Sequence, residues 1–554
     1  MSDRYNVTDI TPMFDIRCTI QVDMIPMRDG VKLHTNIYFP PDFSGKAPVL
    51  LMRQPYTRTT WFNLPDAGAL QEGIIYIQQA TRGTGWSEGG VFDPAEKQRE
   101  IEDAEDTLNW LAGKDFFNGC CVMHGASYPG WTQWCAAFNA HPALCAISPR
   151  VAPLYGCVGS ARKGGGNALS FATHWMLSMH HRRHYGYAGV PSFEELKTDW
   201  HLPVIECDTF SGYAPNAPYR KFIASAANPG KLLKDHIADF SKITIPAFIS
   251  GGWFDGFKEE TIESFQLMKH TSATELSRNA THLTIGPWVH GGLLNKDIFG
   301  EENDYRELNA VQAEFLWGVA RNPQKNPLPG VPQVKYFMLG ENRWHESSDW
   351  PPPEMKYTEK YLHGDGSIDD STAGNTACRT YISDPNDPVL VNNGKHDCAG
   401  CYDLTETEKR DDLLVYTTGI LTEDLLIVGE VKLSFSAAVE APDTDFFATL
   451  TEVEADGRSM LRTGGMIRAR FRNSLEEAEL LTPGKVYRFN LSLGNVAANF
   501  RKGNRLRLII AGQNFPEYDR NAQSGKEIFS DVELFPAKCT IMHDEAAVLY
   551  LPEI

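Results

Sequence analysis

The hydrophobic pattern between residues 31 and 150 alternates between short apolar runs and an amphipathic segment. Residues 31–40, 47–56 and 73–79 are rich in Val, Ile, Leu and Tyr and predict strands, the latter two with buried apolar cores. Residues 97–113 place apolar side chains at helical spacing on one face and acidic side chains on the other, which predicts a helix. This alternation of strand and helix predicts a mostly parallel sheet covered by helices.

The pattern changes after residue 150 and then returns. Residues 151–236 are rich in His, Trp, Tyr and Gly, become helical in character, and contain no buried strand pattern. Strand signals reappear at 243–256 and 281–292. We therefore predict one α/β domain, formed by residues 1–150 and 237–350, that is interrupted by a helical lid at 151–236.

A third pattern begins near residue 351. A proline-rich linker is followed by many short β-type segments, several of them separated by turn signals such as those at 455–457 and 483–484. Short strands at this spacing are typical of a β-sandwich or jelly roll, which we predict over residues 351–554. The predicted fold class is thus α/β, with a helical lid and a C-terminal jelly-roll domain.

Composition narrows the classes of partner. The 554 residues are 42% hydrophobic and 22% charged, which is typical of globular proteins, and the net charge of −19 disfavours nucleic acid and anionic membranes as partners. The N-terminus lacks the pattern of a secretory signal, and no apolar run reaches the ~18–20 residues of a membrane span. The odd number of cysteines, 11, favours reduced thiols and a cytoplasmic location over a disulfide framework.

Two motifs resemble metal-binding spacings. Cys398 and Cys401 form a single CxxC in a polar segment without a second pair, which favours a loop over a metal or redox centre. His180 and His184 have the i, i+4 spacing of a metal pair, but the HHRRH segment holds two arginines and no carboxylate, which favours a solvated cationic face. We expect neither a metal nor an organic cofactor.

The stretch MHGASYPG, residues 123–130, carries the clearest candidate chemistry. It places Ser127 between Gly125 and Gly130 where a predicted strand turns into a helix, as the nucleophile of an α/β-hydrolase does. The motif departs from GxSxG because Pro129 occupies the second glycine position. For an isolated match of this kind, a buried serine in a glycine-rich turn is the favoured interpretation.

Two later residues complete a catalytic set. A serine hydroxyl needs a base to take its proton and an acid to orient that base, and α/β-hydrolases supply them in the chain order Ser, acid, His. Asp255 and His290 each follow a strand-like segment after the predicted lid, in that order. An Asp-Gly turn or a surface histidine would explain either residue alone, but the three together predict the triad Ser127, Asp255 and His290.

The same pattern suggests donors for the oxyanion that forms during acyl transfer. The backbone N–H of Tyr128 follows the nucleophile directly. Tyr56 lies in the loop after an early strand, where a second donor is expected, although a packed aromatic would fit this position equally well.

Several motifs distributed over nearly the whole chain resemble the family of the cocaine esterases and X-prolyl dipeptidyl aminopeptidases, whose relatives include glutaryl cephalosporin acylases and α-amino acid ester hydrolases. The resemblance implies an α/β-hydrolase domain with a helical lid, a jelly roll that closes one side of the active site, and a tyrosine hydroxyl, here that of Tyr56, in the oxyanion hole. Where the family usually has an acid before the TRG turn, this chain has Ala80, which puts a supporting salt bridge to Arg82 in doubt. The motifs are RQPY, TRGTGWSEGG, GASYPG, GGWFDGF, GPWVHGG, TDFFATLTEVEADG and FRKGNRLRLIIAGQNFPEYDRN.

The expected function is serine hydrolysis of a carboxylic ester or amide of a small acyl substrate through an acyl-enzyme. Aromatic residues predicted to line the pocket, for which core packing is the alternative, are Trp131, Trp175, Trp253, Phe257 and Trp288, together with the lid residues 174–185. GGWFDGF is closer to the simple esterases than to the α-amino acid ester hydrolases, whose clustered carboxylates bind an ammonium group. Glu259 and Glu260 nevertheless leave such a cluster open.

Other functions remain open at this point. They are an X-Pro dipeptidyl aminopeptidase, an acyltransferase or acylase of a biosynthetic pathway that uses the same site, and a carbohydrate-binding or scaffold role of the jelly roll. The predicted partner is a small-molecule ester or amide, with no nucleic acid and no membrane, and the sequence leaves a homo-oligomer open.

Overall fold

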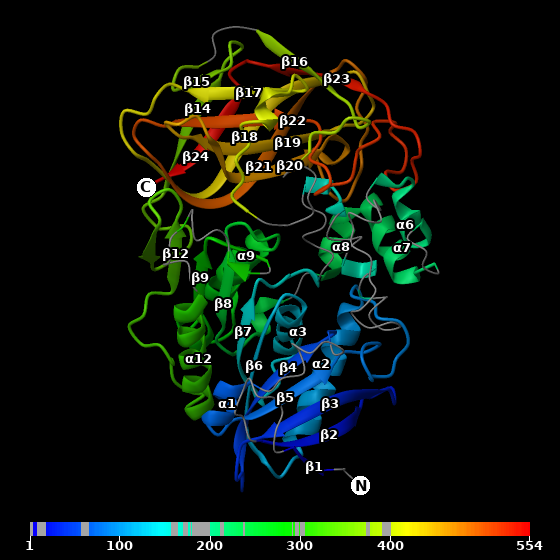
Figure 1. The fold of residues 1–554 in the computed structure, drawn as a ribbon, viewed down its shortest axis with the longest axis vertical. Coiled ribbons are helices and arrows are strands. Elements are labelled where there is room, and N and C mark those ends of the chain that lie inside the picture. Colours follow the sequence, from blue (N-terminus) through cyan, green and yellow to red (C-terminus); the bar gives the residue numbers. More distant parts are fainter. Residues whose placement is uncertain are drawn as a thin grey trace.

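The computed structural model describes residues 4–7, 18–56, 66–156, 164–169, 175–177, 179, 200–210, 215–236, 239–290, 292–293, 299, 305–372, 377–390 and 400–554. Figure 1 shows an α/β domain in the lower half, a β-domain in the upper half and a group of short helices beside the boundary between them. The α/β fold with a helical insertion and a C-terminal β-domain, predicted from the pattern of the chain, is confirmed.

The α/β domain is built on an 11-stranded sheet with the order β1-β2-β3-β5-β4-β6-β7-β8-β9-β12-β13. Its central strands, from β5 to β12, run parallel, and antiparallel strands flank them on both sides. A small separate pair, β10 and β11, follows β9. The strands are β1 (Arg4–Val7), β2 (Cys18–Pro26), β3 (Lys32–Phe39), β4 (Ala47–Gln54), β5 (Ile75–Ala80), β6 (Phe117–Ala126), β7 (Leu144–Arg150), β8 (Phe248–Gly252), β9 (His282–Gly286), β10 (Trp288–Val289), β11 (Gly292–Leu293), β12 (Val334–Met338) and β13 (Arg343–Ser347).

Helices cover both faces of this sheet because its strands are apolar on both sides. Val49 and Leu51 of β4 belong to a core formed with α2, α3 and α9, whereas Leu50 belongs to a core formed with α1 and α12. Neighbouring residues on a strand point to opposite faces, so a continuous apolar run requires this double cover. The helices are α1 (Ala67–Gln71), α2 (Lys97–Ala112), α3 (Tyr128–Ala137), η7 (Phe240–Lys242), α9 (Lys258–Thr271), α10 (Glu275–Asn279) and α12 (Tyr305–Arg321).

The described part of the insertion is helical and packs against the β-domain. Tyr219, Phe222 and Ile223 of α7 form a small core that also includes Phe515 of the β-domain. The segments are η5 (Val204–Glu206), α6 (Cys207–Phe210), α7 (Ala217–Ala224), η6 (Ser225–Ala227) and α8 (Pro229–His236). His180 and His184, which the sequence analysis assigns to a solvated cationic face, lie outside the described residues.

The β-domain curls so that strands far apart in its ladder face one another. The ring of Phe446 on β19 lies 5.2 Å from that of Phe435 on β18 and 4.7 Å from that of Phe489 on β21, measured between ring centroids. These contacts form the inside of a sandwich. The elements are β14 (Lys356–Leu362), β15 (Ser367–Asp369), β16 (Cys378–Ser383), η10 (Thr407–Lys409), β17 (Leu413–Thr418), β18 (Leu425–Val439), β19 (Asp445–Val453), β20 (Ser459–Arg468), η11 (Ala469–Phe471), β21 (Val486–Phe500), β22 (Arg505–Ala511), β23 (Ala537–Met542) and β24 (Val548–Glu553).

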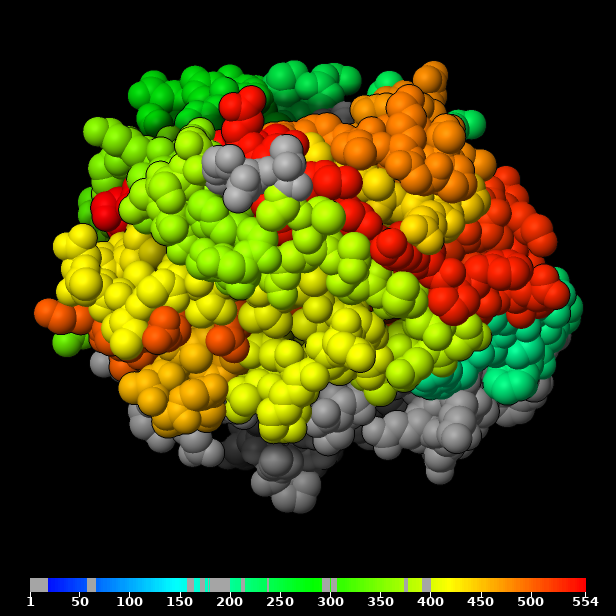
Figure 2. All heavy atoms as spheres, turned by 90° about the horizontal axis from the view of Figure 1, so that it is seen from above, coloured from blue at the N-terminus to red at the C-terminus, as the bar shows by residue number. Residues whose placement is uncertain are grey.

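The two domains share one continuous apolar core. The indole of Trp253, just after β8, lies 5.5 Å from that of Trp350, and the Trp350 N–H donates to the Asn495 side chain of β21 at 2.9 Å. Seen from the β-domain end, most of the surface belongs to residues after 350 (Figure 2). The β-domain therefore covers this end of the molecule. Among the described helices, none is long and apolar enough to cross a membrane.

Candidate active site

The sharp turn between β6 and α3 holds Ser127 in an unusual backbone conformation. Its φ of 64° and ψ of −127° lie outside the regions that L-residues normally occupy, and such strain costs about 1–3 kcal/mol. The turn is held by three backbone hydrogen bonds, from Ser127 N to Arg150 O at 2.9 Å and to Ser127 O from Gly130 N at 2.8 Å and Trp131 N at 3.1 Å. The serine side chain therefore lies at the carboxyl edge of the parallel sheet, where α/β folds place their active sites.

The residues around this turn explain how it tolerates the departure from GxSxG. Pro129 lies in the first turn of α3, where its missing N–H costs no helical hydrogen bond. A Cβ at Gly125 would lie 2.5 Å from the Pro129 side chain, so glycine is required there. A Cβ at Gly130 would lie closer than 3.0 Å to the Cβ of Ala152, so this glycine provides the clearance between helix and strand end.

Ser127, His290 and Asp255 form an unbroken chain of hydrogen bonds. His290 Nε2 lies 2.9 Å from Ser127 Oγ, and His290 Nδ1 lies 2.7 Å from Asp255 Oδ2. The Phe257 N–H donates to the other Asp255 oxygen at 2.7 Å, which fixes the orientation of the carboxylate. The Asp255 side chain is fully buried, whereas 31% of the His290 side chain is exposed, so the base remains accessible from the cavity described below.

Opposing effects act on the pKa of His290. Burial lowers it, but the attraction and hydrogen bond of Asp255 outweigh burial, so the pKa of His290 lies above its ordinary value. The Asp255–His290 pair consequently stabilises the fold most when His290 is protonated, and this contribution is lost as the pH rises through the folded-state pKa. A base must be neutral to accept a proton. Because its pKa is raised, His290 becomes protonated and stops acting as a base at a higher pH than an ordinary histidine would.

The two groups predicted as oxyanion donors belong to residues of one aromatic cluster next to Ser127. The Tyr128 N–H is at the first position of α3, where the helix itself offers no acceptor and its dipole favours negative charge. The Tyr56 side chain packs on the same aromatic cluster as the Tyr128 ring. Its hydroxyl oxygen accepts a hydrogen bond from the Trp175 indole at 3.1 Å.

A cavity of about 590 Å³ opens beside Asp255 and His290, between the α/β domain and the β-domain. This volume is in the range of small-molecule sites. The α/β domain contributes Trp253 and Phe257, and the insertion contributes Gly164 and Ala168. Most other described lining residues come from the β-domain and are largely apolar, including Leu390, Phe447, Leu461, Met466, Phe471, Leu491, Ile509 and Tyr518.

The predicted aromatic walls fall into three groups. Trp253 and Phe257 line the cavity, and the Phe257 ring lies 5.1 Å from the His290 ring. Trp131 and Trp288 are each 1% exposed and belong to the core, not to the described lining of the cavity. Trp175 lies beside Tyr56. Of residues 174–185, the structure describes only 175–177 and 179.

The sequence analysis expected the β-domain to close one side of the active site, but it named none of the β-domain residues that line the cavity. Phe446 and Phe447 are neighbours on β19, so their side chains must point to opposite faces of the strand. Phe446 enters the core of the sandwich, and Phe447 enters the cavity. Two adjacent aromatic residues on one strand imply that both faces of the strand are covered. This pattern at Phe446 and Phe447 is the signal that could have revealed the β-domain side of the cavity.

The two glutamates that could have formed an ammonium site are both engaged elsewhere. The Glu260 carboxylate accepts the backbone N–H groups of Leu154 and Tyr155, the second at 3.1 Å, and is buried. Glu259 accepts the backbone and side-chain N–H groups of Asn495, at 2.9 and 2.6 Å, and lies 3.4 Å from Lys258 Nζ. The pair does not form a carboxylate cluster around the cavity.

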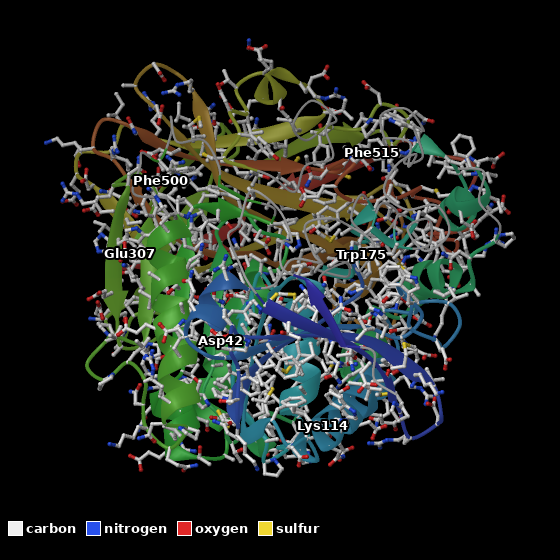
Figure 3. All side chains as sticks on the ribbon, turned by 60° about the horizontal axis from the view of Figure 1, so that its bottom comes forward. Asp42, Lys114, Trp175, Glu307, Phe500 and Phe515 are labelled. Atoms are coloured by element: carbon white, nitrogen blue, oxygen red, sulfur yellow. The ribbon has the colours of Figure 1, made fainter. Side chains whose placement is uncertain are left out.

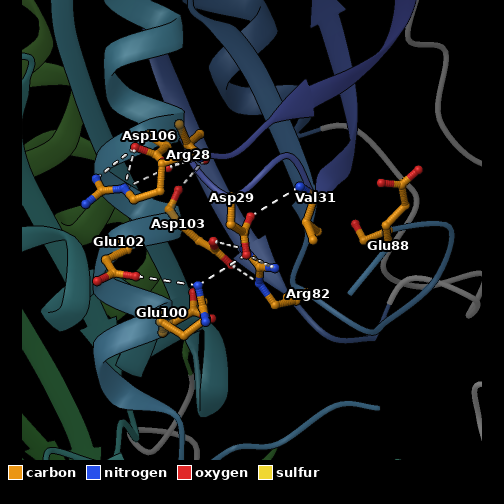
Figure 4. A network of polar contacts seen from close by, with 12 residues as sticks. Arg28, Asp29, Val31, Arg82, Glu88, Glu100, Glu102, Asp103 and Asp106 are labelled. Carbon is orange, nitrogen blue, oxygen red and sulfur yellow. Dashed lines mark hydrogen bonds and ion pairs between the residues drawn. The ribbon is translucent and has the colours of Figure 1, made fainter. Parts of the chain in front are cut away.

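Two acidic residues from other elements take the place of the acid that is missing at position 80 as ion-pair partners of Arg82. Ala80 is buried, and Arg82 pairs with Asp103 of α2 at 2.6 Å and with Asp29 of the β2–β3 turn at 2.9 Å (Figure 4). The Arg82 hydrogen bond is the main cause of the lowered pKa of Asp29. The support for the TRG turn is therefore present but comes from residues distant in sequence.

The structure describes one of the four residues whose spacing resembles that of a metal site. Cys401 is buried, and its thiol donates to Leu461 O at 3.4 Å, while Cys398 lies outside the described residues. In the part of the chain that the structure describes, no three His, Cys, Asp or Glu side chains are grouped closely enough to hold a metal ion.

Comparisons with known proteins agree with this architecture. Residues 29–292 match the family model of the X-Pro dipeptidyl-peptidases (S15 family), and residues 329–551 match that of the X-Pro dipeptidyl-peptidase C-terminal non-catalytic domain. The cocaine esterase of Rhodococcus sp. (strain MB1 Bresler) is 29% identical over 559 residues, which cover 91% of this chain and 92% of the relative.

Two solved structures share the fold at low identity. An aminopeptidase from the marine sediment archaeon Thaumarchaeota archaeon superposes with a TM-score of 0.83 at 23% identity, over 99% of this chain and 97% of its own. An α-amino acid ester hydrolase superposes with a TM-score of 0.82, also at 23% identity, over 97% and 96% of the two chains. The chain therefore belongs to the serine hydrolase family of α/β-hydrolases that includes the cocaine esterases and the X-Pro dipeptidyl-peptidases.

Proposed function

We propose that this protein hydrolyses a carboxylic ester or amide whose acyl or alcohol part is neutral and apolar. The observation that carries the proposal is the continuous chain from Asp255 through His290 to Ser127, with distances of 2.7 and 2.9 Å, on a strained strand-to-helix turn. A strained non-glycine residue at such a position persists where it serves a function. Ser127 is the nucleophile, His290 the general base and Asp255 the residue that orients it.

The reaction proceeds in two acyl-transfer steps. His290 takes the Ser127 proton as the serine oxygen attacks the carbonyl carbon, and the carbonyl oxygen becomes an oxyanion. The Tyr128 N–H and the Tyr56 hydroxyl stabilise that charge. His290 then protonates the leaving group, and the ester of Ser127 is hydrolysed by a water molecule that His290 activates in the same way.

The charges around the cavity support a neutral substrate group. Arg462 is paired with Glu452 at 2.6 Å, with both side chains buried, and Lys258 is paired with Glu259 and donates to Asn495 O at 2.6 Å. These two cations are compensated within the protein, and most of the surface offered to a substrate is apolar, with Glu517 as a further charged residue of the lining. An ester with an uncharged, bulky group fits this surface better than a peptide with a free ammonium group.

An X-Pro dipeptidyl-peptidase is the second candidate, because the family model that covers residues 29–292 carries that activity in its description. Such an enzyme needs an acceptor for a free amino terminus. Among the described residues of the cavity, Glu517 carries a carboxylate outside the triad, and the Asn514 side chain donates to it at 3.2 Å. A Glu517→Gln variant would therefore lower peptidase activity and leave esterase activity unchanged.

The first experiment is labelling with a fluorophosphonate probe, with the labelled peptide located by mass spectrometry. We expect stoichiometric modification of Ser127 that disappears in Ser127→Ala and His290→Ala, while Ser225→Ala, a control on the insertion, labels like the wild type. Labelling of another serine, or none in a folded sample, would contradict the nucleophile assignment. A panel of neutral esters, acyl anilides and X-Pro anilides with free or blocked amines then separates the two candidates, since only a peptidase requires the free amine.

We infer a cytoplasmic location from the thiols. The cysteines that the structure describes are all free, which supports a reducing compartment. Cell fractionation with an antibody to the protein tests this location.

A further inference from the structure

Trp175 contacts both residues that carry the groups we assign to the oxyanion hole. Its indole N–H donates to the Tyr56 hydroxyl oxygen at 3.1 Å, and its ring stacks on the Tyr128 ring with centroids 5.8 Å apart and planes inclined by 26°. Phe92 lies against both rings, 5.8 Å from Trp175 and 5.3 Å from Tyr128. Figure 3 shows Trp175, which belongs to the insertion, near the boundary between the α/β domain and the β-domain.

The direction of the Trp175–Tyr56 hydrogen bond follows from chemistry alone. An indole N–H can only donate, so the Tyr56 oxygen must be the acceptor. The proton of Tyr56 is then directed away from Trp175, because the hydrogen bond occupies the side of the oxygen that faces the indole. A hydroxyl that accepts a hydrogen bond also becomes a stronger donor, since hydrogen bonds in a chain polarise one another.

We propose that Trp175 is a positioning residue that holds the Tyr56 hydroxyl as a donor to the oxyanion of the reaction. This inference rests on the proposed function, in which Tyr56 is one of the two oxyanion donors. The same indole packs on the Tyr128 ring at the start of α3, so one side chain of the insertion contacts both residues that carry the donors. The insertion thereby supports the chemistry as well as covering the site.

The hydrogen bond and the ring packing of Trp175 can be separated by substitution. Trp175→Phe keeps an aromatic ring against Tyr128 and Phe92 but removes the N–H. Phe92→Leu is the matched control, because it disturbs the same ring cluster and leaves the N–H in place. Thermal unfolding and circular dichroism establish that each variant is folded before its kinetics are compared.

The test is a double-mutant cycle of Trp175→Phe and Tyr56→Phe, with kcat and KM measured on a neutral ester. Loss of one oxyanion donor costs about 10²–10³-fold in kcat, so Tyr56→Phe should fall in this range. Because Trp175 acts through Tyr56, Trp175→Phe should lower kcat by roughly tenfold, with KM nearly unchanged. In the Tyr56→Phe background the same substitution should change kcat less than about twofold, since the group that it orients is absent.

Three results would overturn the proposal. If Trp175→Phe lowers kcat equally in both backgrounds, Trp175 acts independently of Tyr56. If Phe92→Leu lowers kcat as much as Trp175→Phe, the effect is one of ring packing. If Tyr56→Phe reduces kcat while Trp175→Phe has no effect, Tyr56 needs no orientation by the indole. A Tyr56→Phe variant with full activity would instead refute the oxyanion role in the proposed function, and this inference with it.

Discussion

Gly130 provides a strict test of how the turn at Ser127 is built. It is inside α3, where alanine is favoured over glycine by about 1 kcal/mol, so helix propensity alone predicts that Gly130→Ala stabilises the protein. The new Cβ, however, would lie closer than 3.0 Å to Ala152 Cβ, and 3.3 Å from Ala152 Cα. Carbon atoms prefer separations of about 3.5–4.0 Å, so the helix must move by at least about 0.5 Å.

The clash should outweigh the gain in propensity. Overpacking of this kind costs about 1–3 kcal/mol, and the displaced helix carries Ser127 away from His290. Since a misplacement of about 1 Å can cost about 10²-fold in rate, we expect kcat/KM to fall by roughly one to two orders of magnitude. Chemical unfolding followed by circular dichroism should show a lower midpoint than that of the wild type.

A second substitution makes this expectation refutable. Ala152→Gly removes the colliding methyl group, so the double variant Gly130→Ala, Ala152→Gly should recover most of the lost activity, with each single variant measured alongside. Gly68→Ala in α1 is the control, because a Cβ there meets only atoms at 3.4 and 3.9 Å and should leave activity unchanged. Full activity in Gly130→Ala, or no recovery in the double variant, would show that the close approach of Gly130 to Ala152 does not position Ser127.

Two further predictions concern buried charges. Asp255→Asn removes the residue that orients His290, so kcat should fall about 10³–10⁴-fold. It also removes the attraction that raises the pKa of His290, so the acid limb of the pH–rate profile should move to lower pH. An acid limb at the same pH as in the wild type would contradict this assignment. In the wild type the Arg468 guanidinium lies 2.8 Å from Asp445 and 2.9 Å from Asp519. Arg468→Met leaves these two buried carboxylates without a cation. The substitution should lower the free energy of unfolding by about 3–5 kcal/mol at neutral pH, and by less at acidic pH, where the Asp445 carboxyl, whose pKa is raised by burial, becomes protonated; a pH-independent deficit would indicate lost packing instead.

Much of the architecture could be predicted from the sequence because it depends on local patterns. The predicted strands at 31–40 and 47–56 correspond to β3 and β4, and the predicted helix at 97–113 corresponds to α2. Apolar periodicity reports which face of an element is buried, and this is a property of neighbouring residues. The antiparallel strands β2 and β13, which lie near the two ends of the sheet and have weaker periodicity, were not predicted, because such strands are defined by their partners more than by their own composition.

The order Ser127, Asp255, His290 could likewise be derived from the chain alone, since each residue follows a strand-like segment and the ends of parallel strands meet at one edge of a sheet. Packing between distant segments could not be derived from the chain alone. Only the tertiary structure shows that the support of Arg82 comes from Asp29 and Asp103, and that Glu260 accepts the backbone N–H groups of residues 154 and 155.

The cavity wall shows the same division most clearly. The sequence by itself determined the type of enzyme, because nucleophile, base and acid must be particular residue types at strand ends. It did not determine the substrate surface, because Phe447 and Met466 become cavity residues only when the β-domain folds back over the α/β sheet. A side chain's chemistry is encoded at its own position, whereas what it faces depends on contacts between segments hundreds of residues apart.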